Sequence, residues 1–417
     1  MRGLCLLSLS RVKRESFLIL FYKLIIIFER LHLDRFYSKG SLKWRKGGCV
    51  LNIINFIFVA VTIMICPLLL GCIKLTGNLK KHAITDRISI IIPAYNDAAH
   101  LRKLLPALFA QLEDMVQIIV VDQGSTDNTT AVVHGCGCEL VHLWDKPDNC
   151  SMHSYACYKG AKRADHNILV FMDANLLPTK ELFQKLTNAL RRHTAISVYP
   201  YEKFSSALGG LGGVRALCRL MLMGSFALPK KEDWGLIGEF VMIDRHDYFN
   251  VCTHDMVGAD CCDSIALGQA YQKAGIRLRN YIGGASLCRF SPKQFKEPSN
   301  PASLFSHSPD GQSLFCIAVF LLGGFDIFVC FLRSIILMEG RVVWTWFYLA
   351  YGMINFYYLR KMAGEYHPLW IVGYPFQIFY TLAAFISGGV KTLKRGKLRI
   401  RRRKGKKEAE AGKGFNL

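Results

Sequence analysis

Three short polar clusters each follow an apolar, β-branched run, and their side chains are of the kinds that bind nucleotides and cations. The clusters read Pro93-Ala94-Tyr95-Asn96-Asp97, Asp122-Gln123-Gly124-Ser125 and Asp173-Ala174-Asn175. Carboxylate and amide oxygens accept hydrogen bonds from a base or a ribose, and Mg²⁺ prefers such oxygen ligands. Taken singly, each cluster also fits ordinary loop and helix-cap residues.

The runs before these clusters predict buried strands, and the stretches between them predict helices. Strands are expected at 88–92, 117–121, 139–143, 168–172 and 278–282, and helices around 101–108, after 125–127, at 154–164 and at 180–192. This alternation is typical of a doubly wound α/β domain. Ligands of such sheets bind beyond the carboxyl ends of the strands, so the three clusters are expected along one edge.

The net charge of +22 would ordinarily suggest a nucleic-acid partner, but its distribution argues otherwise. Residues 86–312 hold 23 Lys+Arg and 23 Asp+Glu, so the whole excess lies outside them, beside long apolar runs. An apolar fraction of 51% excludes a disordered chain. The pattern predicts a membrane protein with a neutral central domain and no nucleic-acid partner.

Several apolar runs are candidate membrane segments. The clearest is 50–73, which has 24 residues and no charge and is long enough to cross a bilayer as a helix. Within 314–390, three further runs predict two to three membrane helices, at 314–332, 342–358 and 369–390. The remaining divisions are a basic extension at 1–49, the central domain at 86–312 and a basic tail at 391–417.

The positive-inside rule places the basic tail in the cytoplasm. Fifteen cysteines without C-x-x-C spacing favour a reducing compartment, so the central domain is also expected to be cytoplasmic, in a multi-pass protein of the cell membrane. An even number of crossings must then separate domain and tail, and the aromatic-rich 342–358 run is expected to lie at the interface or re-enter. The eleven Lys+Arg of 1–49 should also be cytoplasmic, but a single crossing at 50–73 would then place the central domain on the other side of the membrane. Either 17–28 forms a second hairpin limb, or the true start lies near Val50.

The order and spacing of the three clusters resemble the core of glycosyltransferase family 2, which has the nucleotide-sugar-binding GT-A fold. The resemblance covers about 86–290. A narrower similarity, to bacterial 4,4′-diaponeurosporenoate glycosyltransferases, rests on Met152–Gly160, Gly238–Ile243 and Asp263–Tyr271. Those enzymes attach glucose to a membrane carotenoid acid. The resemblance implies a UDP-sugar donor, a lipid acceptor and a membrane location.

The resemblance also implies roles for single residues. It places uridine near Pro93, Tyr95 and Asp97, with Asp122 beside them, although Asp122 fits a helix cap equally well. It makes Asp173 and Asn175 ligands of Mg²⁺ or Mn²⁺ on the diphosphate. Arg289 matches an arginine that would hold the leaving diphosphate, and its plain alternative is a solvated or lipid-headgroup contact.

Asp263 stands at the position of the family's catalytic base, and Asp260 is its nearby competitor. At the start of a predicted helix, the dipole would keep its carboxylate ionised. The resemblance implies a single displacement with inversion at the anomeric carbon. A carboxylic acid acceptor is already ionised at neutral pH, so Asp263 would then position it rather than deprotonate it.

Three departures from the family pattern leave alternatives open. Gln123 and Asn175 replace acids, and 149–152 lacks the expected Gly-Lys. A polyprenyl-phosphate glycosyltransferase and a degenerate nucleotide-sugar binder without turnover therefore remain alternatives. The stretch 205–228 is either an interfacial helix that admits a lipid or a core helix.

Overall fold

The computed structural model describes residues 57–63, 75–84, 86–112, 115–147, 150–190, 193–204, 207–222, 235–257, 263–290, 311–338 and 341–384. The chain forms two compact units, Met1–Val61 and Thr62–Leu417. The predicted basic extension, the basic tail and most of the 50–73 span lie outside the described residues. Within that span, residues 57–63 are helical.

A seven-stranded mixed sheet forms the centre of the second unit, with the order β3-β2-β1-β4-β8-β6-β9. Its strands are β1 (Ile88–Ala94), β2 (Val116–Asp122), β3 (Glu139–His142), β4 (Ile168–Met172), β6 (Thr194–Tyr199), β8 (Phe240–Asp244) and β9 (Arg277–Ile282). The first four strands of that order run parallel. β8 runs antiparallel to β4 and β6, and β9 is parallel to β6.

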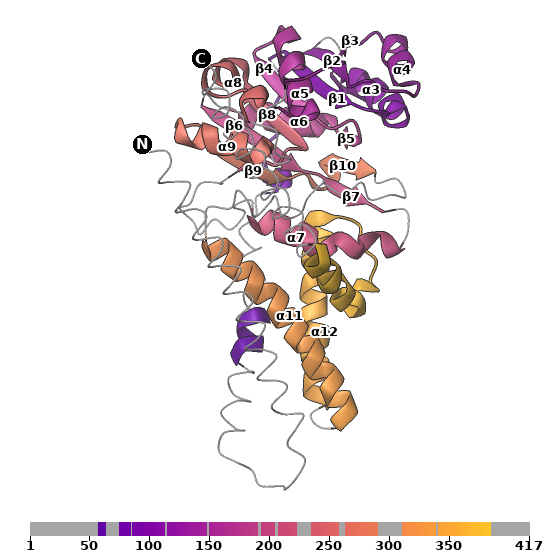
Figure 1. Ribbon diagram of the computed structural model, residues 1–417, viewed down its shortest axis with the longest axis vertical. Coiled ribbons are helices and arrows are strands. Elements are labelled where there is room, and N and C mark those ends of the chain that lie inside the picture. Colours follow the sequence, from indigo (N-terminus) through magenta and orange to yellow (C-terminus); the bar gives the residue numbers. More distant parts are fainter. Residues whose placement is uncertain are drawn as a thin grey trace, which may run out of the picture. The chain divides into compact units, whose positions relative to one another are not determined.

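Helices cover both faces of this sheet, as a doubly wound domain requires (Figure 1). Apolar side chains of α3 (Ala98–Leu112), α4 (Thr129–Gly135) and α6 (Lys180–Ala189) pack on one face. Side chains of α5 (Met152–Arg163), α8 (Arg245–Val251) and α9 (Asp263–Lys273) pack on the other. Because both faces are covered, the central strands β1 and β4 are largely apolar, and every residue of both is buried.

The predicted strands at 88–92, 117–121, 139–143, 168–172 and 278–282 are confirmed within one or two residues. The predicted α/β architecture is confirmed as a mixed sheet, in which β8 runs against both of its neighbours. β8 therefore starts at the edge where β4 ends, since Phe240 pairs with Met172. We call the edge at which β1, β2 and β4 end the carboxyl edge.

A second sheet of three short strands lies beyond the carboxyl edge. It consists of β5 (Leu176–Pro178), β10 (Leu287–Phe290) and β7 (Tyr201–Lys203), in that order. β10 pairs antiparallel with β5 and parallel with β7, which places Arg289 opposite Leu176 and Glu202. The small sheet thus carries residues from three distant parts of the chain to the end of β4.

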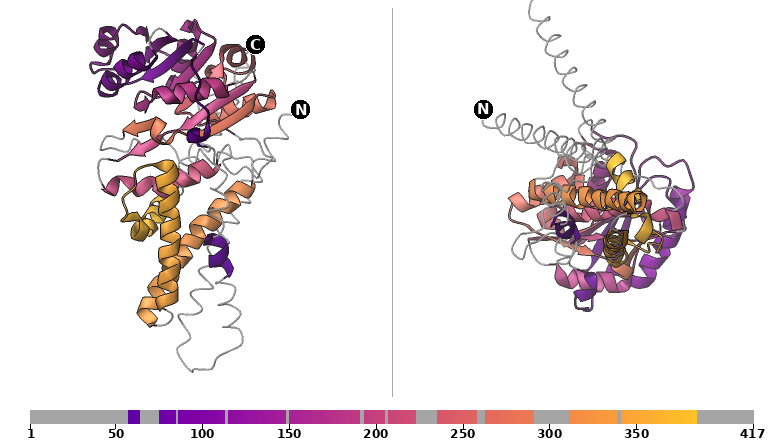
Figure 2. Two further views of the ribbon diagram at one scale, coloured as in Figure 1. Left: turned by 180° about the vertical axis from the view of Figure 1, so that it is seen from behind. Right: turned by 90° about the horizontal axis from the view of Figure 1, so that it is seen from below.

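The C-terminal part consists of α11 (Gly311–Leu337), α12 (Arg341–Tyr358), a π-helical turn (Leu359–Ala363) and a helix at 370–384. α11 and α12 lie side by side in both figures (Figures 1 and 2). Within the described part of the chain, one helix segment, Ile317–Leu337 of α11, is long and apolar enough to cross a membrane. The predicted runs 314–332 and 342–358 lie in α11 and α12, and residues 370–384 of the third run are helical. The number of crossings stays a prediction.

Helix α7 (Gly213–Leu222) joins the α/β domain to these C-terminal helices. Gln377 donates a hydrogen bond of 2.7 Å to the carbonyl oxygen of Gly210, just before α7. A Cβ atom at Gly213 would lie 2.8 Å from the ring of Tyr366, so this close approach of the α7 backbone to Tyr366 requires glycine. Most described side chains of α7 are buried, which favours the core-helix interpretation of 205–228 over the interfacial one.

Candidate functional site

The carboxyl edge brings the three polar clusters together. Ala94 of β1 pairs with Asp122 of β2, and Ile91 of β1 pairs with Phe171 of β4. The cluster residues that follow these strands therefore lie on neighbouring loops. Pro93 is the buried penultimate residue of β1, whereas the side chain of Tyr95 is exposed just beyond it.

The loops after β1 and β2 are locked to each other by hydrogen bonds. Asn96 has a φ of +55° and accepts hydrogen bonds from the backbone N–H groups of Thr126 (2.8 Å) and Asp127 (3.3 Å). Asp97 accepts one from the N–H of Tyr95 at 3.1 Å and lies 3.1 Å from His100 Nδ1. These bonds fix the loop backbone, so Tyr95 is presented on a rigid support.

Asp122 is almost fully buried, with 2% of its surface exposed. It accepts a hydrogen bond from the N–H of Ser125 at 3.1 Å and lies 3.5 Å from Nδ1 of His142. The capping bonds are made by Asp127 instead, which accepts from the N–H groups of Ala98 and Thr129. Asp122 therefore supports the loop between β2 and α4 and does not cap a helix.

Asp173 and Asn175 follow β4 at the carboxyl edge. The N–H of Asp173 donates to the carbonyl oxygen of Glu239 at 3.1 Å, so the start of β8 holds the end of β4. The Asp173 side chain is 32% exposed. Burial raises its pKa, and the charge of Arg289 offsets part of that rise.

The residues present fit a hard divalent cation. Asn175 Oδ1 is buried and has no hydrogen-bond partner within the described part of the chain. An orphaned amide oxygen two residues from a partly exposed carboxylate is a donor set that Mg²⁺ or Mn²⁺ accepts. The carboxylate of Asp173 and the amide oxygen of Asn175 are therefore suited to a cation.

Arg289 lies among three carboxylates. Its Nη2 atom is 3.5 Å from Asp173 Oδ2 and 3.6 Å from Glu239 Oε1, and its Nη1 atom is 3.6 Å from Glu202 Oε1. Its side chain is only 17% exposed, so a solvated or headgroup contact, the plain alternative from the sequence, is wrong. Burial alone would lower the pKa of Arg289, but these carboxylates, Glu239 foremost, raise it.

The structure adds three charged residues that the sequence did not single out as site residues. Arg219 of α7 forms a salt bridge with Glu239, which directly precedes β8. Burial raises the pKa of Glu202. Burial acts in the same direction on Glu239, but the charges of Arg219 and Arg289 outweigh it and lower the pKa of Glu239. We call Asp173, Glu202, Arg219, Glu239 and Arg289 the ion cluster. Glu239 had one signal in the sequence, since a lone acid at the start of an apolar run is unusual.

Asp263 is the first residue of α9, as predicted, but its side chain and Asp260 lie outside the described part of the structure. His254 lies nearby in sequence and is buried against the ring of Phe171, with centroids 4.5 Å apart. Burial lowers the pKa of His254 to about 3, so the ring is neutral. Its Nδ1 atom lies 3.0 Å from Tyr248 Oη, which makes a structural role the simpler one.

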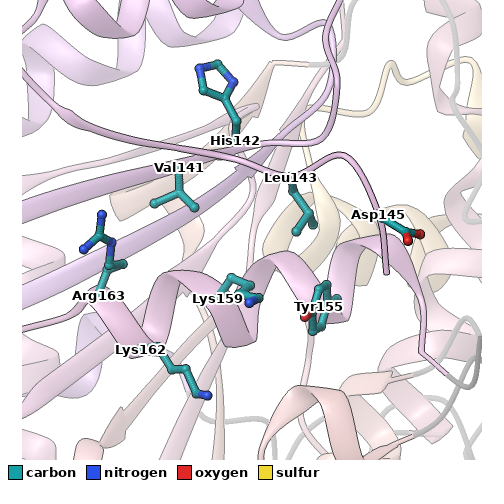
Figure 3. Close-up of a pocket in the computed structure, with 8 residues that line it drawn as sticks. All are labelled: Val141, His142, Leu143, Asp145, Tyr155, Lys159, Lys162 and Arg163. Carbon is teal, nitrogen blue, oxygen red and sulfur yellow. The ribbon is translucent and has the colours of Figure 1, made fainter. Parts of the chain in front are cut away.

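A basic hollow of about 400 Å³ lies beside the site and not in it (Figure 3). It is lined by Val141, His142, Leu143, Asp145, Tyr155, Lys159, Lys162 and Arg163. β3 and the segment after it form one wall, and α5 forms the other. His142 and Leu143 connect the hollow to the predicted residues, because His142 lies 3.5 Å from Asp122 and the N–H of Leu143 donates to the carbonyl oxygen of Asp122 at 2.8 Å.

Among the described residues, Asp244, His246 and Asp247 form a further group of possible metal ligands, at the opposite edge of the sheet. Asp244 pairs with Ile168, the first residue of β4, whereas Asp173 follows the last residue. Asp244 accepts a hydrogen bond from the N–H of His246 at 2.8 Å and caps the seven-residue helix α8. A helix cap therefore accounts for this group.

Comparison with known proteins gives consistent sequence matches. Residues 89–240 match the model of the family described as glycosyl transferase family 2. A 4,4′-diaponeurosporenoate glycosyltransferase from Staphylococcus haemolyticus is 28% identical over 207 residues, 48% of this chain. The chain spans 55% of the length of that relative. A protein of the same name from Staphylococcus aureus strain MRSA252 is 24% identical, over 74% of this chain and 85% of the relative.

Solved structures give a weaker likeness. Glucosyl-3-phosphoglycerate synthase from Mycobacterium tuberculosis, in complex with Mn²⁺, UDP and its glucosylated product, aligns with a TM-score of 0.40 and 17% identity, over 54% of this chain and 82% of that one. Its complex with Mn²⁺, UDP-glucose and phosphoglyceric acid gives 0.42 and 16%, over 57% and 89%. At these TM-scores the structural likeness adds nothing to the sequence matches.

Proposed function

Residues 89–240 form a glycosyltransferase family 2 domain, and we propose that the protein moves a sugar from a UDP-sugar to a lipid acceptor at a membrane. Glucose is the proposed sugar, and a carotenoid acid or a similar apolar acid is the proposed acceptor. The names of the staphylococcal relatives support an acceptor of this class.

We propose that the uridine lies on the loops after β1 and β2. The exposed ring of Tyr95 offers a stacking surface, and its support is fixed by the bonds around Asn96 and Asp97. Pro93 completes the wall at the end of β1. Asp122 is placed beneath this loop pair, where its carboxylate can accept a hydrogen bond from the base or the ribose.

The diphosphate is assigned to the region around Asp173. Asp173 and Asn175 would hold Mg²⁺ or Mn²⁺, which would neutralise charge on the departing UDP. Arg289 lies beside Asp173 and can donate several N–H groups to phosphate oxygens without changing its charge. Stabilisation of the leaving group at this point lowers the barrier to transfer more than it strengthens ground-state binding.

Asp263 is proposed as the group that meets the acceptor. With a hydroxyl acceptor it would take the proton, and with a carboxylate acceptor it would only orient the nucleophile. One displacement inverts the anomeric carbon. The start of α9 favours an ionised carboxylate there, because the helix N-terminus is electropositive.

A membrane location is supported by the surface of the C-terminal helices. Large apolar side chains on these helices and their flanks are exposed: Ile335, Ile336, Val342, Val343, Trp346, Met353, Tyr357, Leu369, Val372, Phe376 and Phe379. Such a surface is suited to lipid. We propose a multi-pass protein whose glycosyltransferase domain faces the cytoplasm.

The single observation that carries the proposal is the contact of Arg289 with Asp173 at the carboxyl edge, two residues before the unpartnered amide oxygen of Asn175 in the described part of the chain. UDP release from UDP-glucose by the protein in native membranes tests it, with Mn²⁺ and with EDTA. We expect release that depends on the metal and falls at least about 100-fold in Asp173→Asn, because the substitution removes the charged ligand. Asp165→Asn, at the other end of β4, should leave it unchanged.

Equal release by the parent protein and Asp173→Asn would contradict the proposed site. UDP binding without turnover in the parent would instead support the nucleotide-sugar binder. Inhibition of release by added polyprenyl phosphate would point to a polyprenyl-phosphate acceptor.

A further inference from the structure

Two arginines from distant elements meet on one carboxylate oxygen at the carboxyl edge. Arg219 Nη1 contacts Glu239 Oε1, and Arg289 Nη2 lies 3.6 Å from that same oxygen. The two guanidinium groups come from α7 and from β10. Like charges placed this close together repel each other, so the arrangement needs an anion between or beside them.

Arg219 is in close contact with Glu239, whereas the protein's own carboxylates hold Arg289 only loosely. Every salt-bridge distance from Arg289 to an acid is 3.5 or 3.6 Å, which is longer than the 2.7–2.9 Å typical of a strong charge-assisted hydrogen bond. Arg289 Nε is buried and has no hydrogen-bond partner within the described residues. Arg289 therefore has donor capacity that a further anion could use.

The position of the cluster indicates which anion. Asp173 is its most exposed member and faces the proposed diphosphate region, while Glu239 at the rear is nearly buried. An anion bound to Asp173 through a divalent cation would be close to Arg289, whose Nη2 atom lies 3.5 Å from that acid. Arg219 belongs to the same cluster, because it shares Glu239 with Arg289. A diphosphate carries enough oxygens to bind both guanidinium groups and the cation at once.

We propose that Arg219 is a second cation for the donor diphosphate, which it binds together with Arg289 while Glu239 holds the two side chains in place. This inference rests on the proposed function. It assigns to α7 a direct part in donor binding, in addition to its contact with the C-terminal helices.

α7 has the support that such a role needs. The helix lies between the ion cluster and the C-terminal helices, where Gln377 holds the backbone at Gly210 and Tyr366 packs on Gly213. Its neighbour Arg215, one turn earlier, lies over the ring of Tyr380 at 5.6 Å. The charge of Arg215 also acts on Glu202 of the ion cluster, so the control is Arg245 of α8, which lies over the ring of Phe249 at the opposite edge of the sheet.

The test compares the binding of UDP and of uridine to the purified full-length protein in detergent with Mn²⁺. UDP is followed by calorimetry and uridine by ligand-observed NMR. In Arg219→Gln we expect UDP to bind about 10- to 100-fold more weakly and uridine to bind as before, because only the phosphates lose a partner. Arg245→Gln should leave both affinities unchanged, and Arg219→Lys should restore part of the affinity for UDP.

The outcomes separate this inference from the proposed function. A parent protein that binds no UDP would overturn both. A parent that binds UDP, with unchanged affinity in Arg219→Gln, would overturn the inference alone. An equal loss of UDP and uridine binding in Arg219→Gln would also overturn it, since that pattern is expected of a residue that only maintains the fold.

Discussion

Asn175 offers one neutral oxygen where a second carboxylate would bind a divalent cation more strongly. Its Oδ1 atom is buried without a partner in the described part of the chain, and Asp173 supplies the nearby charge. Arg289 and Arg219 bring positive charge to the same place. Compared with a site that has two aspartates, the proposed site would therefore rely more on arginines and less on acids.

Asn175→Asp is expected to tighten cation binding, because it adds a full negative charge beside Asp173. The Mn²⁺ concentration for half-maximal UDP release should fall roughly tenfold, which corresponds to about 1.4 kcal/mol. A Mn²⁺ titration of UDP release measures it. Asn167→Asp, which adds the same charge at the other end of β4, is the control. An unchanged midpoint in Asn175→Asp would show that this oxygen does not meet the cation.

The site residues differ in how far the sequence could predict them. Asp122 and Asp173 end apolar runs, so strand topology alone places them on one edge. Glu202 and Arg219 carry no such signal. The contact of Glu202 with Arg289 depends on the pairing of β7 with β10, and the contact of Arg219 with Glu239 depends on the path of α7. Asp127, and not Asp122, makes the capping bonds, a distinction that only the loop geometry supplies.

At the level of elements, α5 packs unusually close to the sheet. A Cβ atom at Gly160 would lie 2.4 Å from Ile91 Cγ2 and 3.1 Å from Val121 Cγ2. Both neighbours are buried strand residues whose branched side chains have little freedom. The helix whose first turn adjoins the proposed donor site is thus held in place by a glycine contact.

Gly160→Ala should therefore lower the free energy of unfolding by about 1–3 kcal/mol, since the methyl group overpacks the interface. Gly135, at the end of α4, has nothing within 4 Å of a Cβ atom, and Gly135→Ala should be neutral or slightly stabilising. Thermal unfolding in detergent compares the two variants. Equal melting temperatures for Gly160→Ala and the parent would show that α5 does not pack this closely.

The strands were predictable where they are fully buried, since a short apolar run between turns is long enough for a core strand and too short for a core helix. The direction of β8 was not, because pairing direction is set by the path of the chain and not by residue type. Between β6 and β8 the chain makes β7 and α7 beyond the carboxyl edge, so it re-enters the sheet from that side. This reversal places Glu239 in the site.

At the scale of the second unit, the ion cluster of the proposed donor site and the C-terminal helices are directly connected. Glu202 belongs to the ion cluster, and its carbonyl oxygen accepts a hydrogen bond of 2.9 Å from the N–H of Glu365, just after the π-helical turn. Tyr201 of the same strand donates to the carbonyl oxygen of Arg360. An acceptor held by the C-terminal helices would therefore be close to the strand that supports Arg289.

The transfer of labelled glucose from UDP-glucose into the organic extract of native membranes tests the central claim most directly. The account predicts label in an apolar lipid in the presence of Mn²⁺, with at least about 100-fold less in Asp173→Asn at equal protein level. Undiminished lipid label in Asp173→Asn, or label confined to water-soluble products in the parent, would contradict it.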